Sequence, residues 1–296
     1  MNIRQVIKKI KLPIQKNINI YQIEYRKNPL EEYDDLIMKN LFIDEIKNRP
    51  DYIHLKNNYT EKDNINRFVA INFIISISET FEFKQETIYL AINLYDRCYD
   101  KFKICYKPVN IKIFVLSCIF IASKYEEIYP PLLEDYSEYC FFFKSEIFNL
   151  ESFILDIINF ELLICSPYLF LTKFFYSNTK EENKEILYLA QLILDLSIIS
   201  LDFCRLKPSK QASICLYLSR YITYNNKNTS KLWTWEDEFT TGVSELEIKA
   251  NIKPSIIKIK EFSDGRLTKD INKTGIFKKY YSHKYLSVAK RFRCYF

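Results

Sequence analysis

Apolar residues recur at helical spacing along most of the chain. After Thr60, a residue type suited to cap a helix, they fall at positions 65, 68, 69, 71, 73, 74, 75 and 77. Similar patterns predict helices over residues 30–47, 85–99, 132–139 and 144–158. The stretches 111–127 and 186–200 are apolar almost all round, which is typical of helices buried on every side.

A second group of helices is predicted after Ser166-Pro167, where serine can cap a helix and proline suits its first position. The expected ranges are 167–176, 180–203, 208–223, 232–241 and 244–262. Each half then holds about five helices with a very apolar one among them, although no sequence repeat relates the halves. We therefore expect an all-α protein built from two tandem five-helix domains.

The expected organisation has five parts, which differ in charge as well as in pattern. They are a basic tail (1–29), an N-terminal helix (30–50), a first helical domain (51–162), a second helical domain (163–275) and a basic C-terminal segment (276–296). Arg49-Pro50 ends the N-terminal helix, because the residue before a proline avoids the α conformation.

The composition excludes several functional classes. The 296-residue chain has only three glycines, too few for a glycine-rich phosphate loop or a hairpin-rich β fold. Its eight cysteines form no C-x-x-C pair and only two histidines occur, so we expect no metal site and no cofactor. The cysteines fit small buried side chains of a reducing compartment. No apolar run approaches the roughly 20 residues of a membrane span, so we expect a soluble, intracellular protein without membrane contacts.

Positive charge is concentrated at both ends. The net charge of +6 divides into +6 for residues 1–29, −8 for residues 30–265 and +8 for residues 266–296. Solvated tails are the ordinary reading of such charge runs. Two more specific interpretations of the basic ends are contact with nucleic acid and a nuclear import signal, and both stay open at this point.

Few side chains are candidates for catalysis or for binding a partner. Lys124 closes the apolar run 113–122, either covering the core edge with its stem or directing a cation at a partner. Glu126 and Glu127 are neighbours on a helix and do not face each other, so a catalytic pair is not expected. Glu127 is expected to cap or pair locally. Glu151 interrupts an apolar helix and fits its solvent side.

Arg67 and Asp96 also interrupt apolar helical patterns, and an unpaired charge there would be costly. We predict an internal ion pair between them. His54 and His283 lie near no recognisable nucleophile, so an enzymatic function is the least supported class. Trp233 and Trp235 are expected to pack at the edge of the second core.

Several stretches together resemble the mitotic A/B-type cyclins. The most specific is Ala-Ser-Lys-Tyr-Glu-Glu-Ile-Tyr-Pro-Pro at 122–131, and the others are 86–97, 150–162, 166–171 and 279–285. The resemblance covers about residues 30–292 and implies two stacked five-helix cyclin folds. It also implies a regulatory subunit, not itself an enzyme, that binds and activates a cyclin-dependent Ser/Thr kinase in cell-cycle control around G2/M. Such a subunit is expected in nucleus and cytoplasm.

The resemblance implies roles for individual residues. Lys124 and Glu151 match the pair that contacts the kinase. The matched apolar kinase contacts are Tyr125, Ile128, Leu155, Phe160 and, from the preceding helix, Ile37. Arg67 and Asp96 match the internal ion pair that holds the first cyclin fold together.

The family's docking groove for Arg-x-Leu substrates is altered in this chain. Its aligned residues are Asn66, Val69, Ala70, Phe73, Ser76 and Lys112. Ser76 stands at the position of an acid, and Lys112 stands where the family often has a neutral polar residue. The groove has therefore lost the negative charge that would meet a substrate arginine, and we expect weak or altered docking. Residues 1–29 also contain no Arg-x-x-Leu destruction motif.

Two other functions share the same fold. One is a cyclin of a transcriptional kinase, against which the 122–131 run and the match in the second half argue. The other is a cyclin-fold DNA-binding transcription factor, which the basic ends favour. Such factors tend to carry a zinc ribbon, and this chain has none, so a nucleic-acid partner is not expected.

Overall fold

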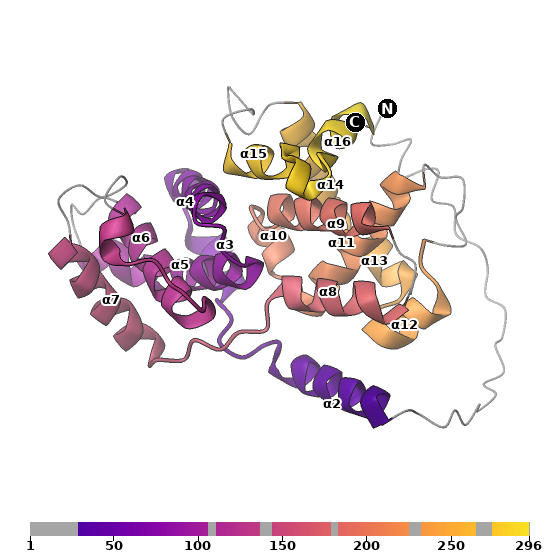
Figure 1. Ribbon diagram of the computed structural model, residues 1–296, viewed down its shortest axis with the longest axis horizontal. Coiled ribbons are helices and arrows are strands. Elements are labelled where there is room, and N and C mark those ends of the chain that lie inside the picture. Colours follow the sequence, from indigo (N-terminus) through magenta and orange to yellow (C-terminus); the bar gives the residue numbers. More distant parts are fainter. Residues whose placement is uncertain are drawn as a thin grey trace.

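The computed structural model describes residues 29–105, 111–136, 144–178, 183–224, 232–264 and 274–295. Over these ranges the chain is helical without strands, and two groups of helices lie side by side (Figure 1). The basic tail predicted for residues 1–29 falls almost wholly outside the described residues. None of the described helices is both long and apolar enough to cross a lipid bilayer.

The first domain is built around a helix that is buried on all sides. Its elements are α3 (Tyr52–Asn58), α4 (Glu61–Thr80), α5 (Gln85–Cys105), α6 (Ile111–Glu126), η1 (Leu133–Tyr136) and α7 (Lys144–Ile158). Every residue from 113 to 123 on α6 is buried, as its apolar pattern predicted. Thr60 caps α4 in a reciprocal capping box with Asp63. α5 runs past its predicted end because Phe102 continues its buried face.

The second domain repeats this layout around α9. Its elements are α8 (Pro167–Asn178), α9 (Lys184–Ser197), α10 (Leu201–Cys204), α11 (Pro208–Thr223), α12 (Trp235–Thr241), α13 (Glu245–Asn251) and α14 (Lys253–Ser263). The helix predicted over 180–203 is divided at 198–200, where the carbonyls of Ile198 and Ile199 accept hydrogen bonds from Arg67 of the first domain. The helix predicted over 244–262 is divided before Pro254, which lacks the N–H needed to continue it.

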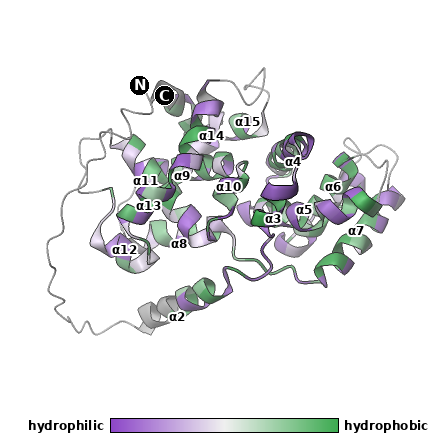
Figure 2. Ribbon diagram, turned by 180° about the vertical axis from the view of Figure 1, so that it is seen from behind, coloured by the Kyte–Doolittle hydropathy of each residue, from purple (hydrophilic) through white to green (hydrophobic). Residues whose placement is uncertain are grey.

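The helix α2 (Pro29–Asp44) lies beneath the second domain, apart from α6 and α7 (Figure 1). Its Phe42 ring lies 5.5 Å from that of Phe170 and 6.4 Å from that of Phe174, both on α8. Outer helices such as α2 and α7 carry hydrophobic and hydrophilic residues on the same helix (Figure 2). Amphipathic helices of this kind bury one side against the core.

The basic C-terminal segment expected over residues 276–296 is folded, in contrast to the solvated tail that is the ordinary reading of such a charge run. Residues 274–295 fold into α15 (Gly275–Tyr281), η4 (His283–Tyr285) and α16 (Val288–Tyr295), so the predicted boundary at 275/276 falls inside a helix. α15 packs on α4 and α9, and α16 packs on α9. Tyr280 and Phe292 are fully buried. The segment folds because its apolar residues cover surfaces of both domains.

The two tryptophans have opposite environments. Trp233 is buried and its indole N–H donates to the Val243 carbonyl at 2.9 Å, as expected for the core edge. Trp235 is 73% exposed, which corrects the same expectation for it. The reason is the orientation of α12, which turns Asp237 and Thr241 inward and therefore turns Trp235 outward.

Candidate functional site

The ion pair between Lys124 and Glu151 joins the end of α6 to the middle of α7. The ammonium of Lys124 contacts a carboxylate oxygen of Glu151 and also lies 4.3 Å from the ring centre of Phe120. The Lys124 side chain is 40% exposed and that of Glu151 is 14% exposed. The sequence placed these residues 27 positions apart, and the structure brings them together at the rim of the first core.

Apolar side chains follow Lys124 and Glu151 closely along α6, α7 and the segments after these helices, and most of them are exposed. Tyr125 is 47% exposed, Ile128 77% and Phe160 68%, while Leu155 on α7 is half-buried. Tyr125 and Phe160 together line a shallow surface depression. Exposed apolar residues gathered in one place are unusual on a monomer and mark an interaction surface. We call Lys124, Glu151, Tyr125, Ile128, Leu155 and Phe160 the α6–α7 surface.

Phe160 is held outward by an unusual turn. Asn159 and Phe160 have φ angles of 53° and 59°, in the left-handed region that a bulky residue seldom adopts. The N–H of Phe160 donates to the Leu155 carbonyl at 3.0 Å, and Arg97 on α5 donates to the Glu161 carbonyl at 2.8 Å. The first domain thus fixes a strained turn that presents an exposed aromatic ring.

Ile37 stands apart from the α6–α7 surface. It is 44% exposed on α2, which lies beneath the second domain (Figure 1). Sequence reasoning also missed Phe148, which is 52% exposed on α7 and meets Phe120 edge-on at 6.3 Å. The available signal was helical spacing, because residues 148, 151 and 155 share one face of α7.

Glu126 and Glu127 have separate structural roles. A carboxylate oxygen of Glu127 accepts hydrogen bonds from the Lys84 N–H at 2.8 Å and from the Thr87 hydroxyl at 2.5 Å, so it caps the start of α5. Burial raises the pKa of Glu126, and the nearby carboxylate of Glu86 raises it further. The local capping role expected for Glu127 is thus confirmed.

Arg67 and Asp96 form a buried ion pair that also joins the two domains. Two guanidinium nitrogens of Arg67 donate to the two Asp96 oxygens, each at 2.8 Å. The remaining terminal nitrogen donates to the Ile198 carbonyl at 2.8 Å and to the Ile199 carbonyl at 3.1 Å. The pair was predicted as internal to the first domain, and its further contacts link that domain to the end of α9.

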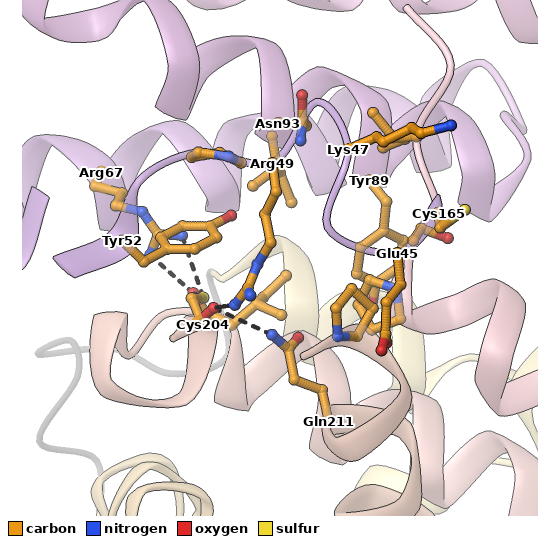
Figure 3. A pocket seen from close by; sticks show the side chains of 17 residues that line it. Glu45, Lys47, Arg49, Tyr52, Arg67, Tyr89, Asn93, Cys165, Cys204 and Gln211 are labelled. Atoms are coloured by element: carbon orange, nitrogen blue, oxygen red, sulfur yellow. Dashed lines mark hydrogen bonds between the residues drawn. The ribbon is translucent and has the colours of Figure 1, made fainter. Parts of the chain in front are cut away.

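A cavity of about 50 Å³ lies at this junction (Figure 3). Arg49, which precedes α3, points into it and donates to the carbonyls of Cys204, the last residue of α10, and of Leu206 just beyond it. Gln211 donates to the same two carbonyls at 3.3 and 2.8 Å. The donors satisfy carbonyls that a helix end leaves without partners. The cavity walls therefore serve to attach the N-terminal linker to the second domain.

A second buried junction contains Asp195, Lys279, Tyr89 and Tyr280. The ammonium of Lys279 lies 2.8 Å from Asp195, and the hydroxyls of Tyr89 and Tyr280 each donate to Asp195 at 2.7 Å. Lys279 is 1% exposed and Asp195 0%. Burial, and next the Asp195 charge, raise the pKa of both tyrosines well above the ordinary value, which keeps their hydroxyls protonated as donors. The three helices α5, α9 and α15 meet here.

The residues aligned with the docking groove lie along α4 and at the start of α6. Val69 is 43% exposed and Phe73 is half-buried, whereas Ala70 is buried and offers no open wall. Asn66 donates to the Tyr99 hydroxyl at 2.9 Å. Lys112 is exposed on α6.

Ser76, at the acid position of the groove, is in close contact with α15. A Cβ atom on Gly275 would lie 2.9 Å from the Ser76 nitrogen and 2.7 Å from the Asn72 carbonyl oxygen. The nearest glutamate along α4 is Glu79, whose carboxylate accepts a hydrogen bond from the Tyr285 hydroxyl at 3.4 Å. Burial raises the pKa of Glu79, while the nearby Lys279 and Lys284 oppose this. Its carboxylate is thus engaged by the C-terminal segment.

The two histidines of the described residues, His54 and His283, are both exposed. Within the described ranges no group of three or more His, Cys, Asp or Glu side chains could hold a metal ion. His54 lies 3.6 Å from Asp100 at the surface, and His283 is exposed in η4.

Two protein-family models match the chain. The model for the cyclin N-terminal domain matches residues 36–163, and that for the cyclin C-terminal domain matches residues 165–292. The chain therefore belongs to the cyclin family.

Its curated relatives are A- and B-type cyclins. Cyclin-A1-2 of Arabidopsis thaliana is 26% identical over 263 residues, which cover 86% of this chain and 56% of that protein. G2/mitotic-specific cyclin-1 of Saccharomyces cerevisiae is 28% identical over 297 residues, covering 93% of this chain and 59% of that protein. The chain thus spans little more than half the length of these relatives.

A solved structure has the same fold. A viral cyclin from herpesvirus saimiri superimposes with a TM-score of 0.62 at 19% identity, covering 76% of this chain and 97% of that one. The likeness supports the arrangement of two tandem cyclin domains that the helices define.

Proposed function

We propose that the chain is a regulatory subunit that binds and activates a cyclin-dependent Ser/Thr protein kinase in cell-cycle control. The observation that carries the proposal is the α6–α7 surface, where a preformed Lys124–Glu151 pair lies among exposed apolar side chains. Apolar area supplies affinity, and a charge pair at its edge supplies orientation and partner choice. Membership of the cyclin family and the A- and B-type relatives support the same assignment.

The proposed activity needs no catalytic group in this chain. A partner that binds the active kinase conformation more tightly than the inactive one shifts the population between them. Moving that equilibrium from 1:99 to 99:1 takes about 5.5 kcal/mol of differential binding. A single exposed ion pair contributes about 0–1 kcal/mol. The apolar side chains of the α6–α7 surface must therefore contribute most of the binding energy, with Ile37 a separate proposed contact on α2.

The test is kinase activation in a purified complex. The chain would be co-purified with candidate cyclin-dependent kinases and assayed on a histone-type substrate, comparing the natural chain with Lys124→Ala plus Glu151→Ala. Each truncated side chain would leave a polar group of the kinase without its charged partner in the interface, which costs about 2–5 kcal/mol, so we expect a loss of affinity of about 30-fold or more.

A matched control is available on α14. Lys258 and Glu261 form a 2.6 Å pair with side chains 22% and 31% exposed, and their double replacement by alanine should leave activation unchanged. Full activation by the Lys124/Glu151 variant would refute the site. Failure to bind any such kinase would refute the function.

Substrate docking through α4 is proposed to be weak. No carboxylate stands at Ser76, and Glu79 is engaged by Tyr285. In the same assay, an excess of an Arg-x-Leu peptide should therefore leave phosphorylation of the protein substrate unchanged, and strong competition would contradict this. We also propose that the complex is present in nucleus and cytoplasm, which fluorescence imaging of the tagged chain would check.

A further inference from the structure

Two large aromatic side chains project from α12 without any cover among the described residues. Trp235 is 73% exposed and Phe239, one helical turn later, is 82% exposed. Residues four apart lie on the same face of a helix, so the two rings form one strip. We call Trp235 and Phe239 the α12 strip. Contiguous exposed apolar area is more often an interaction site than single scattered apolar residues are.

The α12 strip is not needed to attach α12 to the fold. The opposite face of the helix does that, because Asp237 and Thr241 are each 2% exposed and Asp237 pairs with the buried Arg220 at 2.9 Å. Thr234 caps the helix in a reciprocal capping box with Asp237. Polar residues at 235 and 239 would satisfy this arrangement equally well, so the aromatic rings call for another explanation.

Negative charge borders the α12 strip on both sides. At 100° per residue, Glu236 and Glu238 flank the line from Trp235 to Phe239. Both are exposed, and no lysine or arginine of the described residues forms an ion pair with either. One Glu238 oxygen accepts a hydrogen bond from the Glu245 N–H at 2.9 Å, which leaves its negative charge without a cationic partner among these residues. On the next helix, by contrast, Glu245 pairs with Lys249 at 2.8 Å. The α12 strip therefore suits a partner that is both apolar and cationic.

Residues 1–28 of this chain have that chemistry. They carry seven Lys or Arg residues and one Glu. Ile3, Val6, Ile7 and Ile10 follow helical spacing, and lysines at 8, 9 and 11 lie between and beside them. An apolar stripe with flanking lysines complements two aromatic rings with flanking glutamates.

The chain between position 11 and Pro29 is long enough for the segment to reach the α12 strip. The segment joins the described chain at Pro29, the first residue of α2, and α2 packs on α8 through Phe42. α12 packs on the same helix α8. Roughly 18 residues between position 11 and Pro29 span up to about 60 Å when extended. Tethering gives the segment an effective concentration of about millimolar, which favours it over free competitors.

We propose that the basic amphipathic segment at residues 1–12 docks on the α12 strip of the same chain. The contact would place its lysines beside Glu236 and Glu238 and its apolar side chains on Trp235 and Phe239. The site lies in the second domain, at the other end of the molecule from α6 and α7 (Figure 1). It is therefore separate from the α6–α7 surface.

Trp235 itself reports on the contact. The chain has two tryptophans, and the other is buried, so the emission of the full chain minus that of Trp235→Phe isolates Trp235. In low salt we expect blue-shifted Trp235 emission and severalfold weaker quenching by acrylamide than for an exposed tryptophan. High salt should remove this protection, because it screens the ion pairs.

The deciding variant is Lys8→Glu, Lys9→Glu and Lys11→Glu together in the full chain. It should leave Trp235 fully quenchable in low salt. The matched control is Lys39→Glu, Lys62→Glu and Lys101→Glu, which makes the same change in net charge at exposed described positions and should keep Trp235 protected. Circular dichroism would check that both variants are folded.

Three results would overturn the proposal. Trp235 equally quenchable in the natural chain and in the Lys8/Lys9/Lys11 variant would show that the segment does not cover it. If the control variant also left Trp235 quenchable, the loss of protection would come from the change in net charge and not from the segment itself. Protection that grows with protein concentration would show that a second copy covers the α12 strip instead.

Discussion

Lys279 offers the sharpest test of how the C-terminal segment is built into the fold. Its ammonium lies 2.8 Å from Asp195 and 3.0 Å from the side-chain oxygen of Gln85, and the residue is 1% exposed. Its neighbour Lys278 is exposed on the same helix. Replacing each lysine by methionine makes the same chemical change once inside the fold and once at its surface.

The expected losses of unfolding free energy for the two variants differ by about an order of magnitude. Removing one partner of a buried ion pair costs about 3–5 kcal/mol, because the remaining charge stays buried and uncompensated. The free energy of unfolding of a native protein is about 5–15 kcal/mol, so Lys279→Met removes a large share of the stability. At about 2–4 °C per kcal/mol, the melting temperature should fall by about 6–20 °C. Lys278→Met should change stability by no more than about 0.5 kcal/mol.

Thermal unfolding followed by circular dichroism measures both variants. Adding Asp195→Asn to Lys279→Met should recover part of the loss, because the neutral amide needs no counter-charge. Its oxygen can accept from one of the hydroxyls of Tyr89 and Tyr280, and its NH2 group can donate to the other. Equal melting temperatures for Lys278→Met and Lys279→Met would refute the buried ion pair. A double variant less stable than Lys279→Met would refute the electrostatic account.

Two further predictions concern α4. Gly275→Ala should destabilise the protein by about 1–3 kcal/mol in chemical unfolding, because its Cβ would lie 2.7 Å from the Asn72 carbonyl oxygen, and unchanged stability would contradict that close approach. Burial raises the pKa of Asp63, but hydrogen bonds from Thr60, Tyr99 and Lys103 outweigh it and hold the pKa below its ordinary value. The resulting stabilisation is complete above the unfolded pKa of about 3.9 and is lost as pH falls through the folded pKa. Asp63→Asn should therefore cost more stability at pH 7 than near pH 3, and an equal loss at both would contradict this.

Features that depend on local sequence could be predicted from it. Thr60 and Pro167 mark helix starts because capping and proline geometry involve only nearby residues. The all-round apolar pattern of 111–127 predicts a buried helix without knowledge of its neighbours. Arg67 and Asp96 could be paired because each is a charge within an apolar pattern. Family resemblance, rather than physical reasoning, connected Lys124 with Glu151.

Features that depend on distant partners could not be predicted. Lys279 lies in a basic run, and the carboxylate that makes its burial tolerable is 84 residues earlier. Trp233 and Trp235 are both tryptophans and lie two positions apart, yet one is buried and the other exposed. Only the orientation of α12 accounts for this difference in burial. The division of 180–203 required Arg67, which comes from the other domain. In each case a tertiary contact outweighs the local pattern.

The contact between Gly275 and α4 sets an order of events during synthesis. The N–H of Gly275 donates to the Asn72 side chain across 203 positions of sequence. At about 5–20 residues per second, a ribosome makes α4 roughly 10–40 s before the residue that covers it. Throughout that interval one side of α4 faces solvent or a chaperone. A chain terminated before residue 275 would keep that side open permanently, which gives the cell a physical means to recognise incomplete copies.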